Sequence, residues 1–199
     1  MRILPNGDAS LLVELPDLDA MLGLHDALAA DPPPGVVDLV PAARTLMLVL
    51  GPAADPASVA ARVRSARGRP AGAASSGTVE IPVAYDGPDL AGAAELTGRT
   101  PAELISAHTA TTWQVAFTGF APGFAYLVGG GLNVPRRPTP RVRVPAGSVG
   151  LAGEFSGIYP ADSPGGWQII GHTDTALWDL ERDPPALLRP GIHVHFIAA

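Results

Sequence analysis

The chain opens with apolar and polar residues in the order expected of a small mixed α+β unit. Within residues 18–30, apolar side chains from Leu18 to Leu28 recur at the spacing of one helix face, and the helix is predicted to begin near Asp17. The predicted elements are a strand at 10–15, a helix at 18–30, strands at 36–40 and 45–50, and a helix from Asp55-Pro56 to about Arg67. This order favours a small α+β sandwich with both helices on one face of the sheet.

A segment without hydrophobic periodicity follows this first part. Residues 68–77 (GRPAGAASSG) are small and flexible, which is typical of a linker. We therefore predict an N-terminal α+β domain at 1–70, a linker at 71–77 and a C-terminal domain at 78–199.

The second part is dominated by short predicted strands. Residues 78–85 alternate as a strand, and two short helices come next. The second helix opens with a capping box in which Thr100 is the N-cap and Glu103 reaches back to it. From Trp113 to Ile197 short strands alternate with tight turns, which predicts a β-barrel.

Glycine and proline are concentrated in residues 117–172, which hold twelve of the 23 glycines and seven of the 22 prolines. Such a composition is typical of a linker. Aromatic and branched apolar residues are interleaved throughout, however, and a disordered segment lacks them. We therefore predict ordered strands joined by tight turns. Because Arg136, Arg137, Arg141 and Arg143 lie in the same stretch, it is the candidate binding surface.

Composition excludes several kinds of chemistry. The net charge of -6 argues against a general role in nucleic-acid binding. There is no cysteine, which removes thiol catalysis and disulfides, and all thirteen cations are arginine. Without lysine the chain has neither a Schiff base nor the lysine of a P-loop ATP site. We find no targeting segment or membrane span and expect a soluble, cytoplasmic protein.

Two groups of side chains are open to two interpretations each. The four arginines are suited to hold a carboxylate, a phosphate or an acidic partner surface, but alternating arginines are also typical of a solvated strand face. In residues 141–144 the alternation predicts both arginines on one face and both valines on the other. Phe117, Phe120, Phe124 and Tyr126 either line a pocket or pack in the core.

Ser148 lies in a segment, AGSVG, that resembles the G-x-S-x-G nucleophile elbow except that Ala146 replaces the first glycine. An elbow also requires a helix after the serine, and the residues that follow do not indicate one. His172 and Asp174 would be the triad partners. The sequence therefore gives only weak support to a serine hydrolase.

Histidines give equally weak support to a metal site. His193 and His195 would share one face of the last strand, but two ligands are too few. A third ligand would have to come from His172 or His108 through a coincidence of folding. We therefore expect no metal.

Several long motifs make the chain resemble the KipI / PxpB family of 5-oxoprolinase B subunits, also called allophanate hydrolase subunit 1. The motifs cover most of the chain. They are GDASLLVEL at 7–15, GFAPGFAYL at 119–127, the PRR-x-x-PR-x-x-VPAGSVG run at 135–150, GIYP-x-x-SPGGWQ-x-IG at 157–171 and PALL-x-PG at 185–191.

The resemblance implies an α+β protein, with a small N-terminal α+β domain followed by a cyclophilin-like β-barrel. It also implies a complex with a larger homologous barrel subunit (PxpC/KipA-like) and an ATP-using subunit (PxpA-like). Most members act in an ATP-dependent 5-oxoprolinase that opens 5-oxo-L-proline to L-glutamate. This chain would bind no cofactor alone. Family alternatives are a urea carboxylase/allophanate hydrolase system or a KipI-like inhibitor of a sensor histidine kinase.

Opening a lactam requires stabilisation of an oxyanion. Arg136, Arg137 and Arg141, with the backbone amides of residues 147–150, are the hypothetical contributors. The candidate catalytic residues are Arg137, Arg141, Ser148 and His172. His172 stands where many members have arginine, so its charge depends on pH. The candidate substrate- or partner-binding residues are Phe120, Pro122, Gly123, Phe124, Arg136, Arg137, Arg141, Gly147, Ser148, Gly150, Tyr159, Gly166 and Trp167.

Overall fold

The computed structural model describes residues 1–67 and 77–199. Contacts within the chain divide it into two units, Met1–Ala73 and Ala74–Ala199, and each is described by itself. The predicted linker at 71–77 lies outside the described residues except for Gly77, so the predicted domain boundaries stay predictions. Among the described helices none has the length and apolar character needed to cross a bilayer.

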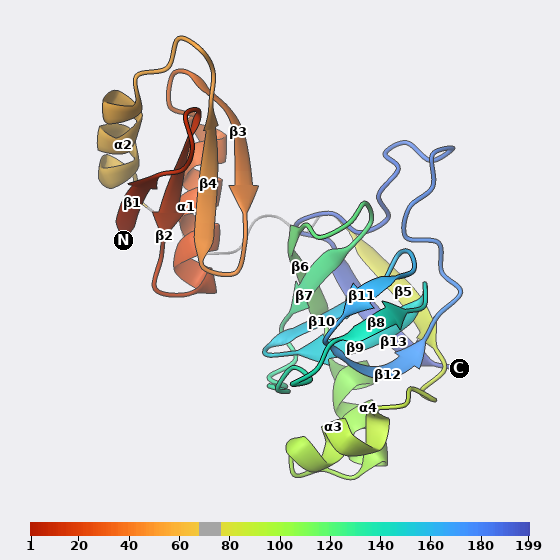
Figure 1. Ribbon diagram of the computed structural model, residues 1–199. Helices are drawn as coiled ribbons and strands as arrows, with labels where there is room; N and C mark the ends of the chain where they lie inside the picture. Colours follow the sequence, from red (N-terminus) through yellow and green to blue (C-terminus); the bar gives the residue numbers. More distant parts are fainter. Residues whose placement is uncertain (68–76) are drawn as a thin grey trace. The chain divides into compact units, whose positions relative to one another are not determined.

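The first unit is a four-stranded antiparallel sheet with two helices (Figure 1). Its elements are β1 (Arg2–Pro5), β2 (Ser10–Glu14), α1 (Leu18–Ala30), β3 (Val36–Pro41), β4 (Thr45–Leu50) and α2 (Pro56–Ser65). The sheet order is β1-β2-β4-β3. The predicted strands and helices are confirmed. The sequence did not predict β1, because its four residues include no buried side chain and therefore give no apolar alternation.

Alternate side chains of the two central strands form the core of this unit. Leu11 and Val13 of β2 are buried and lie opposite Leu48 and Leu46 of β4 on the same face. Helix α1 contacts β3 and β4, and α2 contacts β2. Asp17 caps α1 as predicted, since its Oδ1 accepts a 2.8 Å hydrogen bond from the amide of Ala20.

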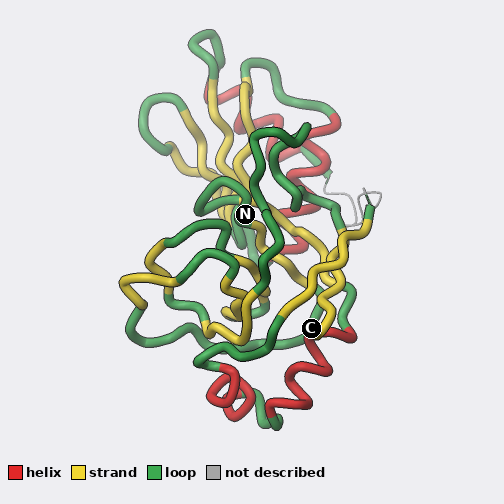
Figure 2. Tube along the Cα trace, turned by 90° about the vertical axis from the view of Figure 1, so that its right-hand side faces the viewer, coloured by secondary structure: helices red, strands yellow, loops and turns green. Residues whose placement is uncertain are grey.

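The second unit is built on a seven-stranded sheet in the order β12-β9-β10-β7-β6-β13-β5, with a separate pair β11-β8. Two helices, α3 and α4, lie side by side at one end of its strands (Figures 1 and 2). Its elements are β5 (Thr78–Val83), α3 (Leu90–Leu96), α4 (Pro101–Ala110), β6 (Trp113–Thr118), β7 (Ala125–Val128), β8 (Arg141–Val144), β9 (Ser148–Ala152), β10 (Phe155–Ile158), β11 (Ser163–Gly165), β12 (Gln168–His172) and β13 (His193–Ala198).

Hydrogen bonds between the two edge strands nearly close this sheet into the predicted barrel. The amide of Ala84, just after β5, donates to the carbonyl of His172 at 2.9 Å, and the amide of His172 donates back at 2.9 Å. Fully buried side chains such as Leu127, Val149 and Val194 fill the interior. The predicted capping box of α4 is also present. Closure at Ala84 and His172 places His172 beside the segment that leads into α3.

Candidate functional site

Two of the predicted arginines converge on a buried carboxylate, that of Asp89 at the start of α3. Arg137 Nη1 donates to Asp89 Oδ1 at 2.8 Å, and Arg141 Nη2 donates to the same oxygen at 2.7 Å. The other oxygen, Oδ2, accepts a 2.7 Å hydrogen bond from the backbone amide of Ile169. Asp89 is only 7% exposed. It therefore ties the loop before α3, the arginine segment and β12 together.

Asp89 stays ionised in this position. Burial by itself would raise the pKa of its carboxyl group, but the hydrogen bonds from Arg141 and the Ile169 amide, with the charges of Arg141 and Arg137, hold that pKa below its usual value. Asp89 is not among the residues predicted from the sequence. The one local signal was an aspartate at a predicted helix start, and its side chain makes no capping bond there.

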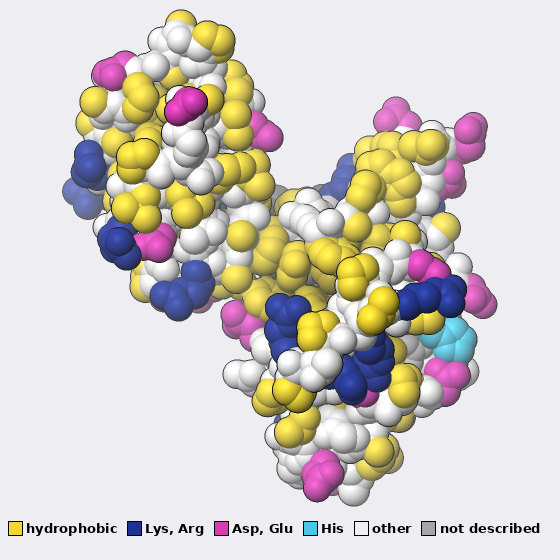
Figure 3. All heavy atoms as spheres, viewed as in Figure 1, with side chains coloured by type: hydrophobic (Ala, Val, Ile, Leu, Met, Phe, Trp, Pro, Cys, Tyr) yellow, Lys and Arg dark blue, Asp and Glu magenta, His cyan; other side chains and the backbone are white. Residues whose placement is uncertain are grey.

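The other two arginines have different environments. Arg143 pairs with exposed Asp162, whose Oδ2 lies 2.7 Å from Arg143 Nε. Arg136 is exposed and makes no ion pair among the described residues. The valines between the arginines also differ, since Val142 is 93% exposed while Val144 is fully buried. The expected valine face is therefore not buried as a whole, because β8 pairs only with the short strand β11. In Figure 3 arginine side chains are spread over the visible face of the second unit.

Three of the four candidate catalytic residues line one cavity of about 350 Å³, which we call the polar cavity after these three side chains, although most of its lining is apolar. These residues are Arg141, Ser148 and His172. Ser148 at the start of β9 lies directly opposite His172 at the end of β12, so both side chains point to the same face. The rest of the cavity is lined by residues 86–88, 144–146, Ile169 and Gly171.

The polar cavity contains an oriented histidine. His172 Nδ1 lies 2.8 Å from Oδ1 of Asp86, and an ionised aspartate can only accept, so Nδ1 carries the proton. This leaves Nε2 of a neutral imidazole as an acceptor. The partner of His172 is Asp86, whereas the weakly supported serine triad would have used Asp174. Ser148 is 5% exposed, and its hydroxyl has no hydrogen-bond partner among the described residues.

Two of the amides expected to hold an oxyanion are already used within the protein. The amide of Gly147 donates to the carbonyl of Tyr159 at 2.8 Å, and that of Ser148 to the carbonyl of Pro145 at 3.3 Å. Ser148 is followed by strand β9, so the segment is not a nucleophile elbow. Of the three arginines expected to contribute, Arg141 lines the cavity.

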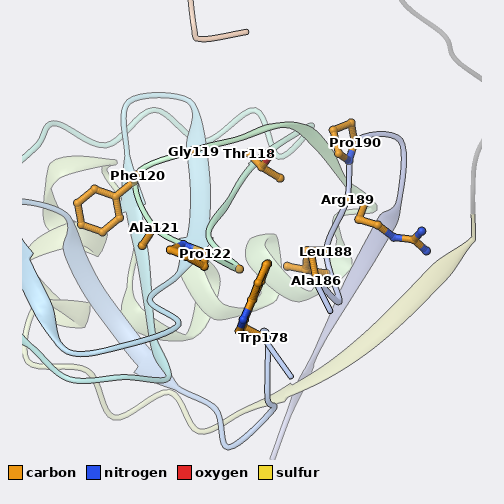
Figure 4. A pocket seen from close by; sticks show the side chains of 11 residues that line it. Thr118, Gly119, Phe120, Ala121, Pro122, Trp178, Ala186, Leu188, Arg189 and Pro190 are labelled. Atoms are coloured by element: carbon orange, nitrogen blue, oxygen red, sulfur yellow. The ribbon is translucent and has the colours of Figure 1, made fainter. Parts of the chain in front are cut away.

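A second cavity, of about 440 Å³, lies under the GFAPG loop, and we call it the apolar cavity (Figure 4). It is lined by residues 118–123, Trp178, Ala186 and residues 188–190. Three predicted binding residues, Phe120, Pro122 and Gly123, belong to it.

The other predicted aromatic residues belong to the core. Phe124, Tyr159 and Trp167 are buried and pack edge to face, with ring centroids of Phe124 and Trp167 5.4 Å apart and those of Phe124 and Tyr159 5.6 Å apart. Their rings support the loop at 119–123 from beneath. Phe117 is buried as well, and Tyr126 is half-buried beside it. Core packing is thus the right interpretation for most of these rings.

Two predicted glycines, Gly147 and Gly150, mark close approaches of the backbone, and a third, Gly166, makes a hydrogen bond to the arginine segment. Gly147 has a φ of +79°, and a Cβ there would lie 2.2 Å from the carbonyl oxygen of Thr173. A Cβ on Gly150 would press against Trp167. The carbonyl of Gly166 accepts a 2.8 Å hydrogen bond from the amide of Arg137. These contacts shape the barrel around the arginine segment.

His108 is a buried structural residue. Its Nδ1 lies 2.7 Å from the hydroxyl of Tyr85, and its Nε2 lies 2.8 Å from that of Ser156. Burial lowers the pKa of His108 to about 3, so it is neutral at physiological pH. Within residues 1–67 and 77–199, no group of three or more His, Cys, Asp or Glu side chains is arranged to hold a metal ion.

The chain is similar in sequence to known proteins. A family model described as carboxyltransferase domain, subdomain C and D, matches residues 1–188. Proteins described as the B subunit of 5-oxoprolinase, from Escherichia coli O157:H7 and Bacillus subtilis (strain 168), are 48% and 47% identical over 124 residues. The match covers 60% of this chain and 57% and 52% of those proteins, so the matched part spans little more than half of their length.

Solved structures share the fold. The crystal structure of TTHA0988 is 35% identical with a TM-score of 0.76, over 96% of this chain and 39% of that one. PH0987 from Pyrococcus horikoshii, described as a conserved uncharacterized protein, is 33% identical with a TM-score of 0.59, over 100% and 97% of the two chains. The Kluyveromyces lactis urea amidolyase is 17% identical with a TM-score of 0.77, over 99% of this chain and 15% of that chain, and this likeness shows the fold alone.

Proposed function

The chain belongs to the carboxyltransferase subdomain C and D family, and we propose that it is a subunit of an ATP-dependent complex that hydrolyses 5-oxo-L-proline to L-glutamate. The observation that carries this proposal is the 47–48% identity to proteins described as the B subunit of 5-oxoprolinase. A protein described in this way acts with other subunits of the same enzyme. We extend this to the present chain, with a larger homologous barrel subunit and an ATP-using subunit as its partners.

The chemistry of the chain supports a division of labour in such a complex. With no lysine, the chain lacks the P-loop residue that contacts the β- and γ-phosphates of ATP. Use of ATP is therefore assigned to a partner subunit. We place the complex in the cytoplasm, in line with the absence of a recognisable targeting segment in the sequence.

We assign the polar cavity as the place where this chain meets the lactam. A five-membered lactam is small and polar, and its N–H and C=O groups need hydrogen-bond partners. Arg141 can stabilise the oxyanion that develops on the carbonyl oxygen. The Ser148 hydroxyl can donate or accept, and Nε2 of His172, oriented by Asp86, can accept a proton. Arg137 acts indirectly, because Asp89 holds it beside Arg141.

The experiment that tests the function measures ADP release that depends on 5-oxoproline. The chain is purified with its two partners, and the assay is repeated with this chain omitted. Activity only in the full set is the expected result. An intact three-subunit complex that releases no ADP with 5-oxoproline would contradict the proposal, and urea, allophanate and a sensor histidine kinase would then be tested in its place.

A further inference from the structure

The walls of the apolar cavity carry two aromatic side chains that the fold leaves largely exposed. Phe120 is 59% exposed, and it has a φ of 72°, the only non-glycine residue with a positive φ among the described residues. A bulky residue in this backbone region costs free energy, of order 1–3 kcal/mol. The Phe120 ring packs edge to face against Phe124 and Tyr159, with centroids 5.2 and 6.1 Å away, but Phe120 stays 59% exposed, so packing within this chain offsets that cost only in part.

The opposite wall presents a second exposed aromatic residue on an ordered hairpin. Trp178 is 42% exposed and pairs with Ala186 across the hairpin, which the amide of Leu187 closes with a 2.9 Å bond to the carbonyl of Leu177. Gly123 brings the two walls together, since a Cβ there would lie 3.0 Å from the Cβ of Trp178. The cavity is thus preformed by two segments that are more than fifty residues apart in the sequence.

Arg189 is the charged side chain at this cavity. Figure 4 shows Phe120 and Arg189 at opposite ends of the cavity, with Pro122, Trp178 and Leu188 between them. The Arg189 side chain extends away from the others and makes no ion pair among the described residues. A ligand here would have an apolar part that fills the cavity and a negative group outside it.

We propose that the apolar cavity docks a segment of the larger barrel subunit, with an apolar side chain between Phe120 and Trp178 and a carboxylate on Arg189. This inference rests on the proposed function for the identity of the partner. A free lactam is a poorer occupant, because these walls offer it few polar side chains, whereas the other cavity offers Arg141, Ser148 and His172. In TTHA0988 this fold makes up 39% of a longer chain, so further polypeptide accompanies it there.

The test measures binding between the purified chain and the purified larger barrel subunit by isothermal titration calorimetry. Phe120→Ala and Trp178→Ala are each expected to weaken binding at least about tenfold, because exposed aromatic anchors contribute most to interfaces. Phe120→Gly removes the ring and relieves the strained backbone, so it guards against misfolding of the alanine variant. The matched control is Leu180→Ala, since Leu180 is 78% exposed on the same hairpin but outside the cavity.

Arg189→Gln tests the charged part of the contact. It is expected to weaken binding at low ionic strength and to flatten the dependence of affinity on salt, because a rim charge acts through a screened field. Unchanged affinity in both Phe120→Gly and Trp178→Ala overturns the proposal, and so does the absence of binding by the unmodified chain. Binding of 5-oxoproline to the isolated chain that disappears in Phe120→Gly would also overturn it, by assigning the cavity to the small ligand.

The outcomes separate this inference from the proposed function. If Phe120→Gly abolishes binding while the intact wild-type complex shows no 5-oxoproline-dependent ADP release, the docking surface stands and the activity is wrong. If ADP release requires this chain but Phe120→Gly binds and turns over normally, the activity stands and the docking surface is wrong.

Discussion

Arg141 donates a hydrogen bond of 2.7 Å from Nη2 to Oδ1 of Asp89, across 52 residues of sequence. The same Asp89 oxygen accepts a hydrogen bond from Arg137, so one buried negative charge holds two arginines. Arg141 is thus positioned by a structural partner, and its side chain also lines the cavity. The same carboxylate is therefore expected to matter for stability and for the geometry of the site.

Asp89→Asn is the direct test of that arrangement. The amide keeps the shape of the side chain but leaves two guanidinium groups without their counter-ion. Removing one member of a buried pair costs about 3–5 kcal/mol, and because both arginines are partly exposed we expect about 2–4 kcal/mol in the free energy of unfolding. Urea denaturation measures it. The control is Asp162→Asn, which breaks the exposed pair with Arg143 and should change stability little; equal effects of the two variants would contradict this prediction.

The ion pairs of Asp89 with Arg137 and Arg141 also predict that the protein loses stability in acid. Because the folded state lowers the pKa of Asp89, its contribution to stability is present above the pKa of an aspartate in the unfolded chain, about 3.9. That contribution is lost as pH falls toward the lowered value. Wild type and Asp89→Asn should therefore converge in stability below about pH 4, and urea denaturation over a pH series measures this.

His108 predicts a second pH dependence, in a different range. Burial lowers its pKa to about 3, whereas an unfolded histidine titrates near 6.5, so between these values only the unfolded chain binds the proton. Stability is then complete above about pH 6.5 and falls below it by up to about 1.4 kcal/mol per pH unit. His108→Gln should be less stable at pH 8 but flatter in acid. Urea titrations from pH 8 to 4.5 measure this, with His25→Gln as control; parallel curves for wild type and His108→Gln would refute it.

Gly147 predicts a steric effect that can be separated from backbone strain. Gly147 and Gly131 both have positive φ, +79° and +59°, but only a Cβ on Gly147 meets another atom, the Thr173 carbonyl oxygen at 2.2 Å. Gly131→Ala should cost about 1–2 kcal/mol from conformation alone. Gly147→Ala should cost at least about 2 kcal/mol more, because backbone must shift. Similar unfolding free energies for the two variants would show that the contact is not tight.

Most elements of this fold can be predicted from local sequence patterns. Contacts between residues that are far apart in the sequence cannot. The capping box of α4 and the helix start at Asp17 depend on residues three positions apart, so their signals are local. Asp89 looks like an ordinary turn residue in the sequence, because its partners lie 48, 52 and 80 residues away. From the sequence, His108 could be interpreted only as an improbable metal ligand. In the structure both of its ring nitrogens are hydrogen-bonded to hydroxyl groups.

In the candidate site, too, local motifs can be read from the sequence but long-range contacts cannot. Motifs point to Arg141, Ser148 and His172, and barrel closure brings them to one cavity. The sequence does not reveal the partner of His172, since Asp86 reaches it only through the pairing of Ala84 with His172. Phe124, Tyr159 and Trp167 share the motifs but are core residues, because burial depends on the packing of the whole barrel.

Ser148→Ala separates a functional hydroxyl from a structural one. The Ser148 hydroxyl lies at the polar cavity and has no hydrogen-bond partner among the described residues, so the fold gains little from it. Alanine should therefore change the free energy of unfolding by less than about 0.5 kcal/mol or increase it. Turnover of 5-oxoproline by the full complex should fall at least about tenfold if this hydroxyl contacts the lactam.

The matched control is Ser156→Ala, because the Ser156 hydroxyl is bonded to Nε2 of His108 at 2.8 Å. Its loss strands a buried histidine nitrogen, so stability should fall by about 1–3 kcal/mol while turnover by the folded complex changes little. The expected pattern is therefore that Ser148→Ala loses activity and Ser156→Ala loses stability. This pattern would show that the Ser148 hydroxyl is left unpaired in the fold so that it can bind a ligand. Unsatisfied polar groups of this kind are typical of functional sites. A Ser148→Ala protein that is less stable and fully active would assign Ser148 to the structure of the barrel and remove it from the site.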